Sequence, residues 1–459
     1  MRVYMIMGTV VYRTHHTWLS RLFLICVTLF MIWTVLISLQ LKSVFEVPVD
    51  SGPVLPHTDI LGILRDIRRS TKAERGADGS LADDKKCLYR RGKTSIEKDS
   101  ISRVGEVCQQ PTFVSPADDK VQLNFSGVSI DVVNREIFSK RTFAKIRHLN
   151  KEAQGAVDET TRNVLSDVSR RGRTCLRSSI TLDDYIYTPG GHWKPRHCVP
   201  RWKVAVVVPF RDRFTQLPIF LRHLVPFLKK QLLEFGIYII EQNNNEPFNK
   251  AFLMNVGFLE SLRFQDWDCV VHHDVDHVPL SYANYYGCGE MPRHFMSGED
   301  TWDYKILYPD MFGQVFGVTR KQMEVINGFP NVYWGWGVED DAIYSRILLH
   351  GYNRSRPVGE VGYYNTIRQD HKQSESNKVR HCLLRHGRER VNSDGLYNIW
   401  YSVPRITVEP LYINVSVDIR PLPWNATWTS CEHNALSNTI GTLDFFFNTF
   451  LGFRHIFRK

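Results

Sequence analysis

The strongest constraint on the fold is a regular alternation of short apolar runs with helix-patterned segments after residue 202. KVAVVVPF at 203–210 has the length and composition of a buried strand, a second run lies at 236–241, and a third lies at 269–273. A helix is predicted at 249–262, and another follows the first run from apolar residues at helical spacing: Leu217, Phe220, Leu221, Leu224 and Leu228. Such alternation predicts an α/β fold with a mostly parallel central sheet covered on both faces.

A second constraint lies near the N-terminus, where residues 22–41 contain no charged side chain. About 20 apolar residues cross a hydrocarbon core of about 30 Å, so we expect one transmembrane helix. A cleaved signal peptide would have a shorter apolar region and a small-residue cleavage site, which this segment does not show. Arg2, Arg13 and Arg21 precede the run, and the positive-inside rule therefore places residues 1–21 in the cytosol.

Sequons and cysteines agree with a lumenal location for the rest of the chain. Four sequons begin at Asn124, Asn353, Asn414 and Asn425, and such acceptors are used only in the secretory pathway. Eight of the nine cysteines follow the apolar run, where disulfides are expected, and none has zinc-ligand spacing. The net charge of +10 is spread along the chain with no basic run interleaved with aromatic residues, so we expect no nucleic-acid partner.

Composition divides the lumenal part into three segments. Residues 42–171 are polar and poor in apolar periodicity, which predicts a stem. Residues 172–420 contain the predicted strands and form the folded domain. Residues 421–459 form a C-terminal extension with an aromatic run at 445–447, which we expect to dock onto the domain; association with the membrane surface is the alternative.

Two aspartates, Asp274 and Asp276, come directly after the third predicted strand. Ligands bind beyond the carboxyl ends of parallel strands, and carboxylates there project from a rigid edge. Hard divalent cations such as Mn²⁺ take oxygen ligands and neutralise a nucleotide diphosphate before it leaves. Two aspartates can also simply cap a turn, which is the commoner case for a bare DxD. The buried strand and the neighbouring motifs favour the metal and diphosphate site.

A second acidic motif is WGWGVEDD at 334–341. Glu339, Asp340 and Asp341 would occupy the first turn of a helix, where the helix dipole favours ionised carboxylates. An ionised carboxylate beside a sugar-stacking tryptophan can deprotonate an acceptor hydroxyl. On charge alone, helix capping is the better explanation. Capping does not require two tryptophans separated by glycine, so we interpret the motif as a binding site with a mobile, glycine-hinged loop.

Two basic segments fall at the same predicted edge. Arg211 and Arg213, within PFRDR at 209–213, suit a phosphate ligand, although such a pair alone is more often a salt-bridged turn. Phe248, Asn249 and Lys250 open the second helix and could place an amide and a cation near the same ligand. A plain helix start is an equally good explanation of that segment.

Five segments, in this order, resemble the β1,4-galactosyltransferase family of animal Golgi enzymes: PFRDR, FNKAFLMNVGF, DVDHVPL, INGFPNVYWGWGVEDD and SDGLYNIWYSV…PLYINVSVDI. The resemblance covers about residues 198–419. It implies a GT-A nucleotide-sugar-binding fold, a Mn²⁺-dependent inverting mechanism, a UDP-galactose or related donor, and a terminal N-acetylglucosamine acceptor. It also implies a single-pass type II protein of the Golgi membrane with a lumenal catalytic domain.

The resemblance assigns roles by position. The nucleotide-sugar contacts would be Pro209, Phe210, Arg211, Asp212, Arg213, Phe248, Asn249, Lys250, Val275, Asp276 and Met311, with Trp336 as the tryptophan of a moving loop. The acceptor contacts would be Val338, Glu339, Asp340 and Asp341. Asp340 would be the general base, beside Glu339, and Asp276 a metal ligand. Cys269 and Cys288 fall on a family disulfide, and Cys198 on half of another, for which Cys175 is the expected partner.

Several positions depart from the family pattern. Family members complete the metal site with MIRH or with two nearby histidines, whereas residues 366–371 read TIRQDH. Thr366 and Gln369 thus replace a thioether and an imidazole, and we expect His371 to bind the metal, with Gln369 as the alternative. Val338 and Gln314 each replace a glycine. Met311 replaces a tyrosine that restricts the donor to galactose, so N-acetylgalactosamine is a second candidate donor.

The resulting hypothesis is an inverting transferase that forms a β1,4 linkage to N-acetylglucosamine of glycoprotein or glycolipid glycans. Asp340 would remove the proton of the acceptor hydroxyl as metal-held UDP departs. Two alternatives stay open. The altered metal segment would also suit a catalytically silent, sugar-binding relative. The His371 similarity would suit a xylose-acting galactosyltransferase of the proteoglycan linker, although the SDGL and PLY segments look more like the N-acetylglucosamine-acting branch.

Overall fold

The computed structural model describes residues 105–110, 112, 116–166, 174, 176, 178–368, 378–421 and 431. All of them belong to one compact unit of the chain, His57–Lys459. The expected anchor at 22–41, the Asn425 sequon and nearly all of the C-terminal extension lie outside these residues. Among the helices of the described part, none has the length and apolar character needed to cross a bilayer.

The centre of the sheet follows the predicted alternation. Strands β4 (Lys203–Phe210), β5 (Glu234–Gln242) and β6 (Cys269–His273) lie parallel in the order β5-β4-β6. Helix α6 (Gln216–Lys230) connects β4 to β5, and α7 (Lys250–Ser261) connects β5 to β6. Strand β13 (Ile413–Val417) adds to β5, also in parallel. The α/β class and these elements are therefore confirmed.

The rest of the sheet is antiparallel, so the prediction of a mostly parallel sheet is wrong. Strands β1 (Ile180–Leu182), β2 (Tyr185–Thr188) and β3 (His192–Pro195) form a meander that joins β5. On the other side, β10 (Val315–Thr319) pairs antiparallel with β6 and with β8 (Arg293–His294). Strand β12 (Arg405–Val408) pairs antiparallel with β13. The meander has short connections in place of helical crossovers, which antiparallel pairing permits.

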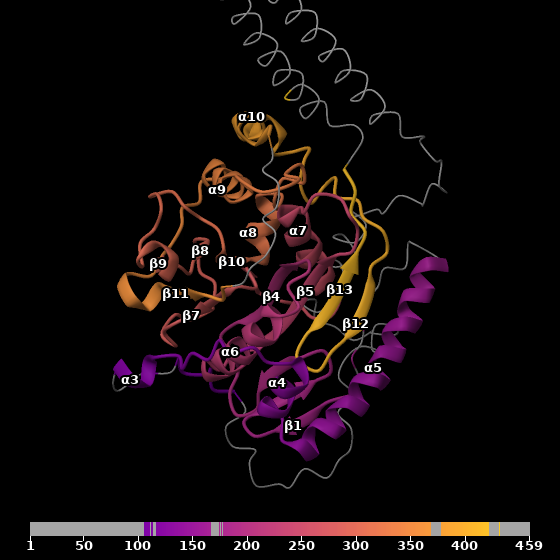
Figure 1. The fold of residues 1–459 in the computed structure, drawn as a ribbon. Helices are drawn as coiled ribbons and strands as arrows, with labels where there is room; N and C mark the ends of the chain where they lie inside the picture. Colours follow the sequence, from indigo (N-terminus) through magenta and orange to yellow (C-terminus); the bar gives the residue numbers. More distant parts are fainter. Residues whose placement is uncertain are drawn as a thin grey trace, which may run out of the picture. The chain divides into compact units, whose positions relative to one another are not determined.

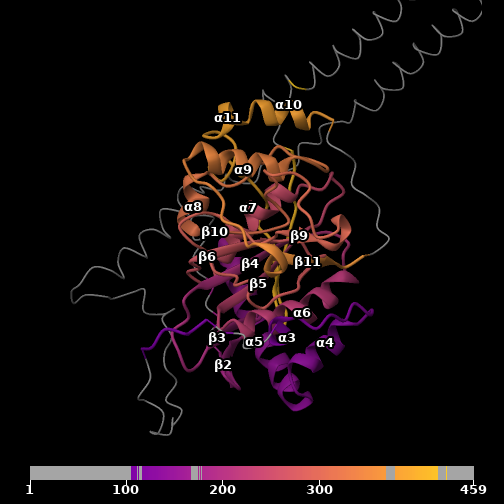
Figure 2. The ribbon, with the colours of Figure 1, turned by 90° about the vertical axis from the view of Figure 1, so that its left-hand side faces the viewer.

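Helices cover both faces of the sheet (Figure 1). Helices α7, α8 (Arg320–Val325) and α9 (Glu339–Leu349) lie on one face, and α6 and α4 (Ile130–Ile137) on the other, as Figure 2 also shows from the side. Alternate residues of β4 enter the two apolar clusters, Val204 and Val206 on the side of α6, and Ala205 and Val207 on the side of α7. Strand β4 is thus buried on both faces.

The packed part of the chain begins earlier than the expected domain boundary at residue 172. Within the expected stem, α4 and α5 (Lys140–Ser166) contribute Val133, Ile146 and Val157 to the two core clusters. Helix α5 lies beside the edge strand β12, where the Gln154 side chain bonds the backbone of Ile406 and Val408. Only a narrow stripe of this helix is apolar, which explains the weak periodicity of its sequence.

Shorter elements complete the described part of the chain. Strands β7 (His277–Pro279), β11 (Tyr363–Thr366) and β9 (Gly298–Glu299) form a separate three-stranded sheet beside the carboxyl end of β6. The remaining short helices are α3 (Pro116–Asp119), η4 (Asp300–Trp302), η5 (Gly359–Gly362), α10 (Arg380–Arg385) and α11 (Gly387–Arg390).

Three disulfides join described residues. Cys269–Cys288 agrees with the prediction. Cys198 pairs with Cys108, so the predicted pairing with Cys175 is wrong. The reason is a contact between distant segments: residues 106–108 run alongside Val199, and the Cys108 N–H donates to the Val199 carbonyl at 2.8 Å. The third bridge, Cys382–Cys431, ties the C-terminal extension to α10 and had no signal in the sequence.

The described sequons differ in accessibility. Asn124 and Asn353 are exposed, as glycan acceptors must be. Asn414 lies in β13 and is half-buried, with its amide donating to Glu241 at 3.0 Å. The first two remain predicted glycosylation sites, whereas attachment at Asn414 would require this amide to leave its partner.

Candidate active site

The DVD motif forms a tight turn between β6 and β7. The Asp274 N–H donates to the Gln314 carbonyl at 2.9 Å, and the His277 N–H donates to the Asp274 carbonyl at 3.3 Å. Asp274 and Asp276 remain partly exposed, while Val275 between them is buried. The turn thus presents both carboxylates at the carboxyl end of a central strand, where the sequence predicted them.

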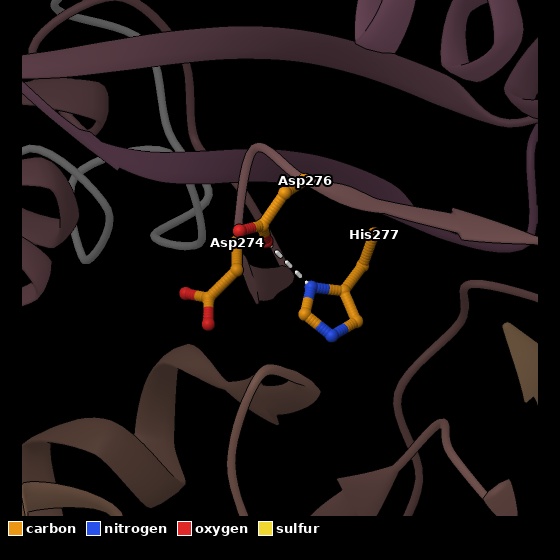
Figure 3. Close-up of side chains that lie close together, drawn as sticks. All are labelled: Asp274, Asp276 and His277. Carbon is orange, nitrogen blue, oxygen red and sulfur yellow. Dashed lines mark hydrogen bonds and ion pairs between the residues drawn. The ribbon is translucent and has the colours of Figure 1, made fainter. Parts of the chain in front are cut away.

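His277 links the second aspartate to a buried glutamate. Its Nδ1 atom lies 2.7 Å from Oδ1 of Asp276, and its Nε2 atom lies 2.9 Å from Oε2 of Glu299 (Figure 3 shows the first contact). Burial alone would lower the pKa of His277, but the Asp276 carboxylate raises it to about 10. Burial likewise opposes ionisation of Asp276, but His277, with Arg213 further away, lowers its pKa.

Sequence reasoning did not select His277 or Glu299. His277 could have been noticed because it directly follows the two aspartates. Glu299 had no signal, since it comes near the turn only through the pairing of β9 with β11 and of β11 with β7.

The side chains of this turn fit a divalent cation. Asp274, Asp276 and His277 can each place one donor atom within 4.8 Å of the others, and Figure 3 shows Asp276 between its two neighbours. Carboxylate oxygens and an imidazole nitrogen are suitable ligands for a cation such as Mn²⁺. Gln369 and His371, the other predicted ligands, lie outside the described residues.

Lys250, at the start of α7, joins the two acidic motifs. Its Nζ atom lies 3.0 Å from Asp274, 3.4 Å from Asp340 and 3.9 Å from Glu339. Burial would lower the pKa of Lys250, but these three carboxylates raise it. Motifs that are far apart in the sequence therefore meet around one ammonium group.

Asp340 lies in the first turn of α9, as predicted. Burial raises its pKa to about 7, with Glu339 and Asp274 adding to the effect and Lys250 opposing it. Gly313 lies against this carboxylate, because a Cβ atom there would come within 2.2 Å of Oδ2 of Asp340. A carboxylate with a pKa near neutrality has the property that a general base requires.

The two tryptophans of the WGWG motif have different environments. Trp334 is buried and packs near Phe252, whereas Trp336 is 55% exposed. Gly335 and Gly337 flank Trp336 with φ angles of 84° and 116°, a region that favours glycine. Trp336 alone is therefore placed to contact a ligand, with the Arg380 guanidinium 5.7 Å from its ring.

The basic segment after β4 reaches the same edge. Arg211 donates to the Glu246 carbonyl at 2.6 Å and lies over the Phe248 ring, 5.1 Å from its centroid. Arg213 donates to Gln216 at 3.1 Å. Asp212 is exposed between the two arginines. Pro209 and Phe210 are the last residues of β4 and are buried, so the arginines are the groups available to a phosphate.

Asn249 has a structural position. It is fully buried and caps α7, since its side chain accepts from the Phe252 N–H at 2.9 Å and donates to the Asn331 carbonyl at 2.8 Å. The structure thus favours the helix-start explanation for this residue. Its neighbour Phe248 accepts a backbone hydrogen bond from Gly335, which connects α7 to the tryptophan loop.

The loop before β10 carries Met311, which is buried, and Gln314. Gln314 and Val338 both have left-handed backbones, with φ angles of 56° and 64°. These are the two positions where glycines were expected, and the conformation is strained for valine because its side chain is β-branched. Asp341 accepts a hydrogen bond from Tyr308 at 2.8 Å.

These side chains suit a divalent cation and a phosphate-bearing ligand, and the half-buried Asp340 carboxylate beside them is a candidate base. Two family models match the chain: the N-terminal region of glycosyl transferase group 7 at residues 167–289, and the N-terminal domain of galactosyltransferase at residues 293–372.

Curated relatives of the chain are also galactosyltransferases. The chain is 52% identical to rat β-1,4-galactosyltransferase 6 over 51% of this chain and 61% of the relative. It is 50% identical to mouse β-1,4-galactosyltransferase 5 over 50% and 60% of the two chains. It is 42% identical to β-1,4-galactosyltransferase 2 of Cricetulus griseus over 51% and 64%. The match thus spans less than two thirds of each of these relatives, and over that span the chain is similar to β1,4-galactosyltransferases.

Among solved structures, the chain is similar to a mutant Drosophila β1,4-galactosyltransferase 7 in complex with manganese, UDP-Gal and xylobiose. The sequence identity is 28%, the TM-score is 0.42, and the match covers 48% of this chain and 95% of that one.

Proposed function

We propose that this protein is an inverting glycosyltransferase of the GT-A fold. It transfers galactose, or N-acetylgalactosamine, from a UDP-sugar in β1,4 linkage to an acceptor sugar, with terminal N-acetylglucosamine as the expected acceptor. The observation that carries the proposal is the position of Lys250, whose Nζ atom contacts both Asp274 of the DVD motif and Asp340 of the second acidic motif. A donor site and a base for the acceptor then lie side by side.

On the donor side, Arg211 and Arg213 bind the diphosphate, since guanidinium groups suit phosphate oxygens. Asp274 and Asp276 are the described carboxylates that would hold Mn²⁺. When bound, the cation neutralises the charge that develops on the departing UDP. Met311 lies on the loop that leads to Gly313 and Gln314, and we expect it to contact the donor sugar.

On the acceptor side, Asp340 accepts the proton of the attacking hydroxyl. Its neighbour Glu339 is buried and also contacts the Lys250 ammonium. Glu339 therefore orients Lys250 and Asp340 relative to each other. Trp336 stacks on a sugar ring, because an exposed tryptophan on a glycine-flanked loop can close over a bound ligand. Attack from the face opposite the departing UDP inverts the anomeric carbon.

We also propose a Golgi location with the anchor at 22–41. Disulfides persist in oxidising compartments, and three of them join described residues. The exposed sequons at Asn124 and Asn353 agree with a lumenal domain.

The test is UDP release by the full chain in detergent with Mn²⁺. Donors are UDP-galactose and UDP-N-acetylgalactosamine, and acceptors are β-linked N-acetylglucosamine, glucose and xylose. We expect turnover with N-acetylglucosamine. Turnover restricted to xylose would favour the linker-type alternative, and no turnover with either donor would leave only the sugar-binding alternative.

The matched variant is Asp340→Asn, which keeps the shape of the side chain but cannot accept a proton. It should lower kcat by about 10²- to 10⁴-fold while UDP still binds, as calorimetry with Mn²⁺ can measure. Retained turnover would remove Asp340 from the role of base.

A further inference from the structure

We propose that His277 is itself a ligand of the divalent cation and that Glu299 orients its ring through a hydrogen bond with Nε2. The inference rests on the proposed function, because it assigns a residue to the cation that the transfer reaction would use. It adds an imidazole from the DVD turn itself to a site for which the sequence predicted only Asp276 and residues of the 366–371 segment.

The first support is the geometry of the ring. His277 is buried, with 7% of its side chain exposed, and its two nitrogens face two carboxylates. Nδ1 points to Asp276 at 2.7 Å and Nε2 to Glu299 at 2.9 Å. A histidine that binds a metal usually donates its other N–H to a carboxylate or carbonyl, which sets the orientation of the ring. Glu299 has that position relative to Nε2, and Nδ1 faces the proposed ligand Asp276.

The second support is the way Glu299 is held. Its side chain is 4% exposed and accepts hydrogen bonds from Gln314 at 2.9 Å and from Thr301. The Gln314 carbonyl in turn accepts from the Asp274 N–H at 2.9 Å. Glu299 is therefore connected to both ends of the turn, through His277 on one side and Gln314 on the other. Such a closed set of contacts restricts the ring to one orientation.

The third support lies on the neighbouring strand. Thr366 is the cross-strand partner of His277 in the pairing of β7 with β11, and directly opposed residues project to the same side of a sheet. The Thr366 hydroxyl is buried and has no hydrogen-bond partner among the described residues. A buried hydroxyl without a described partner, on the residue that lies opposite His277, is consistent with a further group that binds there.

A purely positioning role predicts a different outcome from a ligand role. If His277 only donates a hydrogen bond to Asp276, an amide of similar reach can replace it. If Nδ1 binds the cation, it exchanges the proton that it shares with Asp276 for the metal, and that proton leaves to solvent. The variant His277→Asn separates the two roles, because its amide can donate to Asp276 but offers no imidazole nitrogen.

The experiment is a Mn²⁺ titration of the full chain in detergent, followed by electron paramagnetic resonance. The free-ion signal gives the affinity, and pulsed measurements detect the coupling of Mn²⁺ to a directly bound ¹⁴N nucleus. We expect wild-type protein and His371→Ala to show a ¹⁴N coupling. The ¹⁴N coupling that remains in His371→Ala is assigned to His277. We expect His277→Asn to lose this coupling and to bind Mn²⁺ at least about tenfold more weakly.

Two further variants complete the design. Glu299→Gln keeps the shape of the side chain but removes its charge, and should weaken Mn²⁺ binding by about 10- to 100-fold while the ¹⁴N coupling remains. His386→Asn, at a half-buried histidine before α11, is the matched control and should change neither quantity. If His277→Asn does not fold, Glu299→Gln and the coupling in His371→Ala still test the proposal.

The outcomes are distinguishable. Wild-type affinity and an unchanged ¹⁴N coupling in His277→Asn, or loss of all coupling in His371→Ala, would overturn the ligand role and leave the proposed function intact. If wild-type protein binds no Mn²⁺ yet transfers sugar, the inference fails and the cation is not required. If it neither binds Mn²⁺ nor releases UDP, the proposed function fails as well.

Discussion

The Nζ atom of Lys250 lies 3.4 Å from Oδ1 of Asp340, although 90 positions separate the two residues in the chain. The same ammonium contacts Asp274 at 3.0 Å. A cation at this place favours the ionised form of the proposed base and also fixes its distance from the donor site. The contact therefore links the protonation state of Asp340 to Asp274, the carboxylate on the proposed donor side.

The pKa of Asp340 predicts the acid limb of the pH–rate profile. Burial raises this pKa to about 7, and the base can accept a proton only when it is ionised. We expect kcat to be constant above about pH 7 and to fall about tenfold per pH unit below it. Initial rates of UDP release at saturating substrate concentrations, measured across this range, give the limb. A rate that stays constant down to about pH 5 would contradict a base with a raised pKa.

Replacement of Lys250 by methionine should move this limb. The ammonium lowers the pKa of Asp340, so its removal raises the pKa and the variant should reach its full kcat only at a higher pH. At a fixed pH below the pKa of the base, kcat of Lys250→Met should be about tenfold lower than that of the wild type for each pH unit by which the limb moves. Lys250→Arg keeps the charge and is the matched control. An acid limb at the wild-type position in Lys250→Met would show that the charge does not act on the base.

A methyl group at Gly313 should disturb the base without touching the donor residues. The Cβ atom of Gly313→Ala would lie 2.2 Å from Oδ2 of Asp340, so the carboxylate must move. Displacements of about 1 Å can lower kcat by about 10²-fold. UDP and Mn²⁺ affinities should be retained. Gly289→Ala is the control, because the nearest atom to a Cβ there is 3.8 Å away. Equal kcat values for the two variants would show that Asp340 tolerates the displacement.

Met311 should influence the choice of donor. Its side chain is buried on the loop that precedes Gly313, and a tyrosine there would be larger and would add a hydroxyl. We expect Met311→Tyr to raise the preference for UDP-galactose over UDP-N-acetylgalactosamine by about tenfold or more in kcat/KM. Met311→Leu is a control of similar size. An unchanged ratio in the tyrosine variant would remove Met311 from donor selection.

The elements that position the site could be predicted because each has a local cause. Strand β4 is a continuous apolar run, α7 begins at a capping asparagine, and the acidic residues of α9 stand in its first turn. Asp274 and Asp340 could also be selected from the sequence, since each follows or begins a predicted element. What could not be predicted was that Lys250 would bind both.

The remaining features depend on contacts between distant parts of the chain. Glu299 joins the site through two successive strand pairings, and Gly313 matters only because α9 brings Asp340 against it. Cys108 pairs with Cys198 across 90 residues, and no spacing rule indicates this partner. Helix α5 has a polar sequence because it packs through a narrow stripe, so composition alone placed it in the stem.

The bridge between Cys269 and Cys288 spans 19 positions, and the turn that carries Asp274, Asp276 and His277 lies inside the closed loop. Closing a loop of this length restricts the unfolded chain and favours the folded state by roughly 3 kcal/mol. The three side chains proposed to hold the cation are thus members of a single covalent macrocycle. Its formation removes two electrons, so the oxidant present during folding helps determine whether the protein acquires a working site.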